Sequence, residues 1–136
     1  MNTDARSSIL LVLVCMLTCS CSQEIGFYYK INNSSSKEIT NIKVFNNFYY
    51  NPEDNNRGNC IYSKEKLSSD EQIEKQYYKI GVNVPFGVLP AISYCTITAT
   101  IDNNEITEHC SVDTTENNNT IVFTINDTGI EISTEP

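Results

Sequence analysis

The residues of this 136-residue chain with the most specific chemistry are its six cysteines and its single histidine, His109. Metal sites and nucleophilic catalysis both need several such groups close together. The four cysteines from Cys21 onward are widely separated in the sequence. A catalytic nucleophile also needs a base and an orienting group, and nothing marks a serine or cysteine as the partner of His109. We therefore expect a protein that is not an enzyme and that holds no metal ion and no cofactor.

Carboxylates are the other side chains that could run acid–base chemistry or hold calcium. Most acidic residues fall in expected turns or at exposed positions of expected strands. Residues 51–59 (NPEDNNRGN) offer oxygen ligands at alternate positions, but Arg57 interrupts them and the spacing departs from the EF-hand pattern. We interpret this segment as a surface loop.

Tyrosine is the residue whose placement most suggests binding, because Tyr-Tyr pairs occur at 28–29, 49–50 and 77–78. In a strand, one member of each pair faces outward. Tyrosine and asparagine in loops suit recognition of a protein or a carbohydrate, since they offer contact area and hydrogen bonds at modest entropy cost. The expected binding residues are Phe48, Tyr49, Tyr50, Glu53 and Asp54.

The N-terminus indicates where the protein works. Arg6 is followed by the apolar run of residues 9–17 and then by small residues up to Cys21. This is the layout of a secretory signal peptide, here residues 1–20, and the run is too short to span a bilayer. Cys21 is a candidate lipid-attachment cysteine, although Thr18 stands where leucine is usual. We expect a secreted or cell-envelope protein with one domain, residues 24–136, because about 115 residues suffice for a single core.

Two alternating apolar runs, residues 92–101 and 104–112, flank Asp102-Asn103 and predict a β-hairpin. In its register Cys95 lies opposite Cys110, and a slip of one residue would separate them. Exported proteins sit in oxidising compartments, so we expect a disulfide between these two cysteines.

Cys60 then pairs with Cys21, or stays free if Cys21 carries a lipid. The alternative is a bond from Cys60 to one of the hairpin cysteines, joining two sheets, because sequence alone does not fix disulfide connectivity.

Period-two alternation dominates the rest of the chain, and about eight short strands follow one another at the spacing of a sandwich. In residues 39–45, Thr40, Ile42 and Val44 share one face. Residues 64–76 fit either a short helix, capped by a Ser68–Glu71 capping box, or a turn that leads into a strand. We predict an antiparallel, immunoglobulin-like β-sandwich of seven or eight strands. Its expected core residues are Phe27, Ile42, Val44, Ile80, Val82, Ile97, Ala99, Ile101, Phe123 and Ile125.

The formal net charge of −8 restricts the partners. Nucleic acid needs a basic face against its phosphates, so we expect no nucleic-acid binding. Anionic lipid surfaces repel an acidic protein, so membrane association would come only from a lipid anchor on Cys21.

The order of strands and turns also carries a family likeness. Residues 29–33 (YKINN) and 39–44 (ITNIKV) give a strand, an Asn-rich turn and a second strand, and residues 98–104 (TATIDNN) give a later strand and turn. This order resembles the immunoglobulin-like repeats of bacterial surface proteins, including the cell-adhesion-related (CARDB) type, over residues 28–119. The resemblance implies an extracellular binding or spacer module. Residues 84–110 bear a weaker likeness to the lipid-recognition (ML) sandwich, which implies a lipid carrier.

Together these features predict an exported, non-enzymatic interaction or adhesion module at a cell surface or in the periplasm, whose partner is a protein or a carbohydrate. One alternative is a secreted ligand or inhibitor acting on a host protein. The other is a small lipid carrier, which would need an internal apolar cavity.

Overall fold

The computed structural model describes residues 24–47, 57–81, 92–114 and 119–136, and these residues form eight β-strands and no helix. The chain divides into two compact units, residues 25–80 with 90–136 and residues 1–24 with 81–89. Only Glu24 and Gly81 of the second unit are among the described residues, so the sandwich is formed by the first unit. The predicted signal peptide and Cys21 lie outside the described residues. The strands are β1 (Glu24–Asn33), β2 (Ile39–Asn47), β3 (Asn59–Leu67), β4 (Gln72–Gly81), β5 (Ile92–Ile101), β6 (Asn104–Asp113), β7 (Thr120–Asn126) and β8 (Gly129–Glu135).

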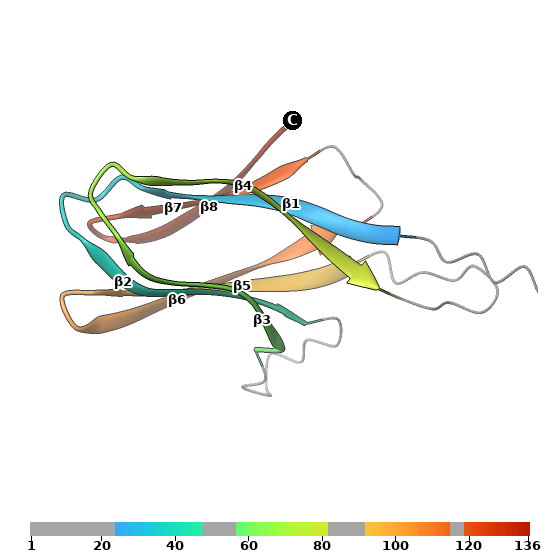
Figure 1. Cartoon of the computed structure of the whole chain (residues 1–136), viewed down its shortest axis with the longest axis horizontal. Helices are drawn as coiled ribbons and strands as arrows, with labels where there is room; N and C mark the ends of the chain where they lie inside the picture. The colour runs from blue at the N-terminus through green and yellow to red at the C-terminus, as the bar shows by residue number, and fades with distance from the viewer. Residues whose placement is uncertain (1–23, 48–56, 82–91, 115–118) are drawn as a thin grey trace, which may run out of the picture. The chain divides into compact units, whose positions relative to one another are not determined.

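The strands build two four-stranded sheets packed face to face, which confirms the predicted β-sandwich (Figure 1). We call β4-β1-β7-β8 the first sheet and β3-β2-β5-β6 the second sheet. Neighbouring strands are antiparallel in the second sheet, and β7 and β8 form an antiparallel hairpin in the first. The pair β1 and β7 is parallel, and the chain crosses from the second sheet back to the first between β6 and β7.

The core lies between the two sheets, as the alternation predicts. Phe123, Ile31, Ile97 and Ile125 are fully enclosed there. Nine of the ten expected core residues are buried, which confirms the faces assigned to most strands, and the tenth, Val82, lies outside the described residues.

A β-bulge in β2 changes one predicted face. Asn41 adopts a left-handed backbone with φ of 51°, and the pairing of β2 with β5 shifts by one residue between Thr40 and Lys43. The extra residue moves Thr40 to the outer face, where it pairs with Thr100, and leaves Ile39 fully buried. The expectation that Thr40 shares a face with Ile42 is therefore wrong, because strict alternation does not cross a bulge.

Two turns decide points that the sequence left open. Residues 68–71 form a tight turn into β4 and no helix: the Glu71 carboxylate accepts a 2.8 Å hydrogen bond from the Ser68 N–H, and the Ser68 carbonyl accepts one of 3.1 Å from the Glu71 N–H. At the predicted hairpin, Asp102 and Asn103 both have positive φ, 49° and 64°, as a two-residue type I′ turn requires.

Candidate functional site

The outward-facing members of two Tyr-Tyr pairs meet on the first sheet. Tyr29 is 3% exposed and points into the core, whereas Tyr28 is half-buried and Tyr77 is 48% exposed. The rings of Tyr28 and Tyr77, on the neighbouring strands β1 and β4, have centroids 4.8 Å apart at an interplanar angle of 44°. These two pairs therefore follow the predicted alternation, and they bring two aromatic rings together on a solvent-facing surface.

Gly26 leaves the space in which the end of the Tyr77 side chain lies. A Cβ atom at residue 26 would stand 2.3 Å from the backbone oxygen of Tyr78, 2.5 Å from the hydroxyl oxygen of Tyr77 and 2.6 Å from the Cζ atom of Tyr77. Real Cβ atoms do not approach so closely, so the Tyr77 ring occupies the space that any other side chain at residue 26 would fill. Aromatic residues commonly cover a strand glycine in this way. The glycine thus permits both the close approach of β4 and the position of a ring that remains about half exposed.

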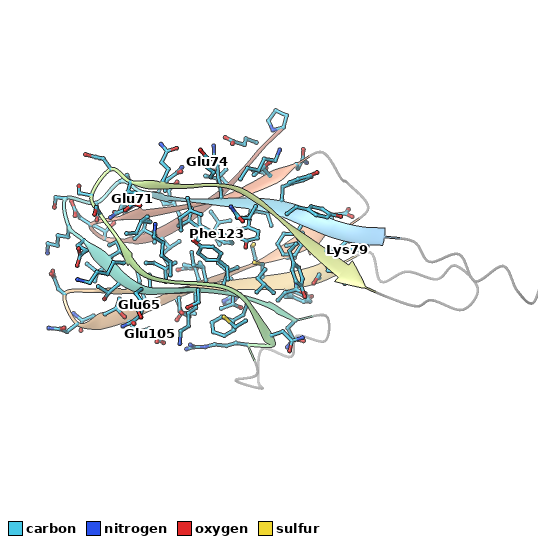
Figure 2. All side chains as sticks on the ribbon, in the orientation of Figure 1. Glu65, Glu71, Glu74, Lys79, Glu105 and Phe123 are labelled. Atoms are coloured by element: carbon cyan, nitrogen blue, oxygen red, sulfur yellow. The ribbon has the colours of Figure 1, made fainter. Side chains whose placement is uncertain are left out.

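A cation completes this surface. The Lys75 Nζ atom lies 4.4 Å from the centroid of the Tyr28 ring, within cation–π range. Lys79 stands two residues beyond Tyr77 on β4, so alternation puts it on the same side of the strand, and Figure 2 shows it near the end of β4. We name Tyr28, Tyr77 and Lys75 the tyrosine platform. Its basic character contrasts with the chain's net charge of −8.

The platform rests on a second aromatic group inside the sandwich. Tyr78 packs edge-on against Phe27 at 5.6 Å, and Tyr29 packs edge-on against Tyr62 of the second sheet at 6.2 Å. Burial raises the pKa of Tyr29 to about 12. Because each inward residue adjoins an outward tyrosine in sequence, the packed interior holds β1 and β4 in place beneath the platform.

The structure confirms the predicted hairpin register and places Cys95 directly opposite Cys110. Cys95 is fully buried and Cys110 half-buried, and burial raises the pKa of both thiols, that of Cys110 to about 11. All three cysteines within the described residues are thiols, so the expected disulfide stays a prediction.

Cys60 is exposed on β3 and belongs to the same sheet as the hairpin. A bond from it to either hairpin cysteine would therefore not join two sheets, contrary to the alternative considered from the sequence.

His109 pairs with Thr96 on the outer face of the second sheet, whereas Cys110, the next residue, belongs to the opposite face. This arrangement does not bring the imidazole to that thiol. Within the described ranges, no three His, Cys, Asp or Glu side chains come together as a metal site. The expected binding residues Phe48, Tyr49, Tyr50, Glu53 and Asp54 lie outside the described residues.

A hollow of about 300 Å³ opens between β1, β6, β7 and β8. Phe27, Val112 and Ile121 supply its apolar lining, and Asp113 is the one ionisable residue in its wall among the described residues. The remaining wall residues are polar: Ser111, Asn119 and Thr134. The wall is thus mixed, with apolar and polar side chains together, and the lipid-carrier alternative stays a prediction.

Comparison with known proteins adds no assignment: no family model matches the chain, and no curated protein matches it. The described residues include no helix with the length and apolar character needed to cross a membrane. The immunoglobulin-like resemblance stays a hypothesis.

The sequence indicated the Tyr-Tyr pairs, but the roles of Gly26 and Lys75 were missed. A signal for Gly26 was present, because an isolated glycine inside a strand pattern often marks a close approach of other atoms. The pairing of β1 with β4 could not be read from the sequence, so the meeting of Tyr28, Tyr77 and Lys75 was not predictable.

Proposed function

We propose that this protein is an exported, non-enzymatic interaction module and that its partner, a protein or a carbohydrate at a surface, binds the tyrosine platform. The observation that carries the proposal is the Tyr77 ring, which lies over Gly26 and against Tyr28 while about half exposed. Export rests on the leader pattern of residues 1–20.

The energetics of recognition favour such a surface. A ring already fixed by its neighbours loses little conformational entropy when a partner covers it. Aromatic residues also dominate the binding energy of interfaces, and a tyrosine offers an apolar face together with a hydroxyl group for hydrogen bonding. Lys75 adds a positive charge at one side of the rings, which favours a partner with an acidic group there.

A secreted ligand or inhibitor of a host protein could use the same surface, and it differs from the cell-envelope form only in lacking a lipid on Cys21. The intact mass of the mature protein separates the two, because it reports the cleavage site, any lipid and the number of thiols together.

The binding test uses the mature protein against a glycan array and a displayed peptide library. Tyr77→Ala should weaken binding of the selected ligand at least tenfold, whereas Tyr77→Phe, which keeps the ring, should retain most of the affinity. A tenfold loss corresponds to about 1.4 kcal/mol, within the range expected for one aromatic contact.

Tyr94→Ala is the matched control, since it removes a half-buried ring from β5 in the other sheet. Each variant must show a cooperative unfolding transition before its affinity is compared. The proposal is wrong if neither library yields a ligand, or if Tyr77→Ala and Tyr94→Ala weaken binding equally.

A further inference from the structure

The facing cysteines of the β5–β6 hairpin occupy a specific kind of position in the hydrogen-bond ladder. Cys95 and Cys110 are direct partners, and the pairing runs without a register shift from Ile101↔Asn104 to Ile92↔Asp113. Counting from the turn therefore shows whether each pair of facing residues is hydrogen-bonded or non-hydrogen-bonded.

A two-residue type I′ turn is closed by a hydrogen bond between the residues on either side of it, here Ile101 and Asn104. In an antiparallel ladder, hydrogen-bonded and non-hydrogen-bonded pairs alternate. Cys95 lies six positions before Ile101, an even number, so Cys95 and Cys110 also form a hydrogen-bonded pair.

This class of pair is the unfavourable one for a cross-strand disulfide. Hydrogen-bonded pairs have Cα atoms about 5.5 Å apart and side chains farther from each other than in the alternate pairs. Facing Cβ atoms in antiparallel sheets lie about 4.5–5.5 Å apart, whereas a relaxed disulfide needs about 3.5–4.5 Å. Closing the bond must pull the two strands together against two ladder hydrogen bonds. Such strain makes a disulfide easier to reduce.

We infer that Cys95 and Cys110 form a strained, reversible disulfide that opens at thiol concentrations where an unstrained bond between the same strands persists. In the forward step, the two thiols give two protons and two electrons to the disulfide of an oxidised dithiol carrier. The Cys95–Cys110 bond forms and the carrier's bond breaks. A small thiol reductant reverses the step and is itself oxidised to a disulfide.

The difference in burial between the two cysteines decides which sulfur atom an external thiolate reaches first. Cys95 is fully enclosed on a central strand, whereas Cys110 is half-buried on β6, which is an edge strand. An external thiolate therefore reaches the sulfur of Cys110 first, and Cys95 leaves. Burial holds both thiol pKa values high, so reoxidation through a thiolate should be slow near neutral pH.

The test equilibrates the mature Cys60→Ser protein in glutathione redox buffers, traps free thiols by alkylation and counts them by mass. The reference protein carries Cys95→Ala, Cys110→Ala, Thr96→Cys and His109→Cys. Its new pair is the adjacent, non-hydrogen-bonded one on the same two strands, and it closes a loop of nearly equal length.

The native pair should be half reduced at a glutathione concentration at least tenfold lower than the reference pair. Should the reference fail to fold, Thr98→Cys with Thr107→Cys supplies a second pair of the same non-hydrogen-bonded class. The inference is overturned if the native pair resists reduction as well as the reference does, or if it forms no disulfide under oxidising buffer. The experiment is independent of the proposed binding function, which supplies only the oxidising location.

Discussion

Asn33 offers the sharpest test of how the sandwich is held together. Its side chain is 1% exposed, and its amide donates hydrogen bonds of 2.9, 3.0 and 2.9 Å to the carbonyls of Lys37, Leu67 and Ser68. Its Oδ1 atom accepts hydrogen bonds from the N–H of Ser35 at 2.9 Å and from the Ser35 hydroxyl at 2.6 Å. One side chain thus ties the β1–β2 turn to the end of β3.

The cost of removing this side chain can be worked from those bonds. The carbonyl of Lys37 keeps the Ser35 hydroxyl as a donor, and that of Ser68 keeps the Glu71 N–H. The Ser35 hydroxyl has one hydrogen, which it then gives to the Lys37 carbonyl. Two groups lose a partner without replacement, the Ser35 N–H and the Leu67 carbonyl, at about 1 kcal/mol each. We expect Asn33→Ala to lower the free energy of unfolding by about 2 kcal/mol, a substantial share of the roughly 5–15 kcal/mol typical of a domain.

Urea denaturation followed by circular dichroism measures this loss. With a slope of about 1–3 kcal/mol per molar urea, the midpoint should fall by roughly 0.7–2 M. Asn32→Ala is the matched control, because the buried Oδ1 atom of Asn32 has no hydrogen-bond partner among the described residues. Removing the Asn32 side chain should therefore change the unfolding free energy by less than about 0.5 kcal/mol. If Asn33→Ala costs less than about 1 kcal/mol more than Asn32→Ala, the buried amide does not hold the turn as described.

Two further predictions concern pH. Hydrogen bonds from the Ser36 N–H and hydroxyl hold the pKa of Asp127 below its ordinary value. The unfolded chain therefore binds protons more readily than the folded one, and stability is lost as pH falls from about 4. Asp127→Asn should make the urea midpoint decline less steeply as the pH is lowered. Burial raises the pKa of Tyr29 to about 12, so above about pH 10 the unfolded state ionises first and stability falls as pH rises. Tyr29→Phe should move the alkaline unfolding midpoint upward, and an unchanged alkaline midpoint in that variant would contradict this account.

The features that sequence predicted correctly are those with local causes. The β5–β6 hairpin follows from a turn pair that tolerates positive φ and from alternation on both sides, and its register placed Cys95 opposite Cys110. The two-layer sandwich follows from the repeated alternation of short strands. Neither inference needed knowledge of which distant strands would pair.

The features that sequence missed depend on distant partners or on one residue breaking the alternation. The bulge at Asn41 inverts the face of Thr40, and asparagine there looks like any other polar strand residue. The parallel pairing of β1 with β7 joins residues about 90 positions apart. The tyrosine platform needed the pairing of β1 with β4, which is equally non-local. The residues expected to bind, Phe48, Tyr49, Tyr50, Glu53 and Asp54, lie outside the described part of the chain, so that prediction stays open.

The distribution of hydrogen bonds separates the part of the sandwich that holds the fold from the part suited to recognition. The turns after β1, β3, β5 and β7 gather at one end (Figure 1). There the polar groups satisfy one another: Lys37 pairs with Asp102, Ser36 donates to Asp127, and Lys64 pairs with Glu71 at 2.9 Å. Groups engaged in this way would have to give up existing bonds to bind a partner.

The tyrosine platform differs from that end of the sandwich in the interactions and the exposure of its side chains. Lys75 takes part in none of the five ion pairs found among the described residues, and it lies over an aromatic ring. Tyr77 is the one large hydrophobic side chain in the described part of the chain that stands out as exposed. Covering its ring with a partner removes apolar area from water and leaves the hydrogen bonds of the turns intact, so binding there does not carry the added cost of breaking those bonds. This asymmetry is the physical reason to look for recognition on the outer face of β1 and β4.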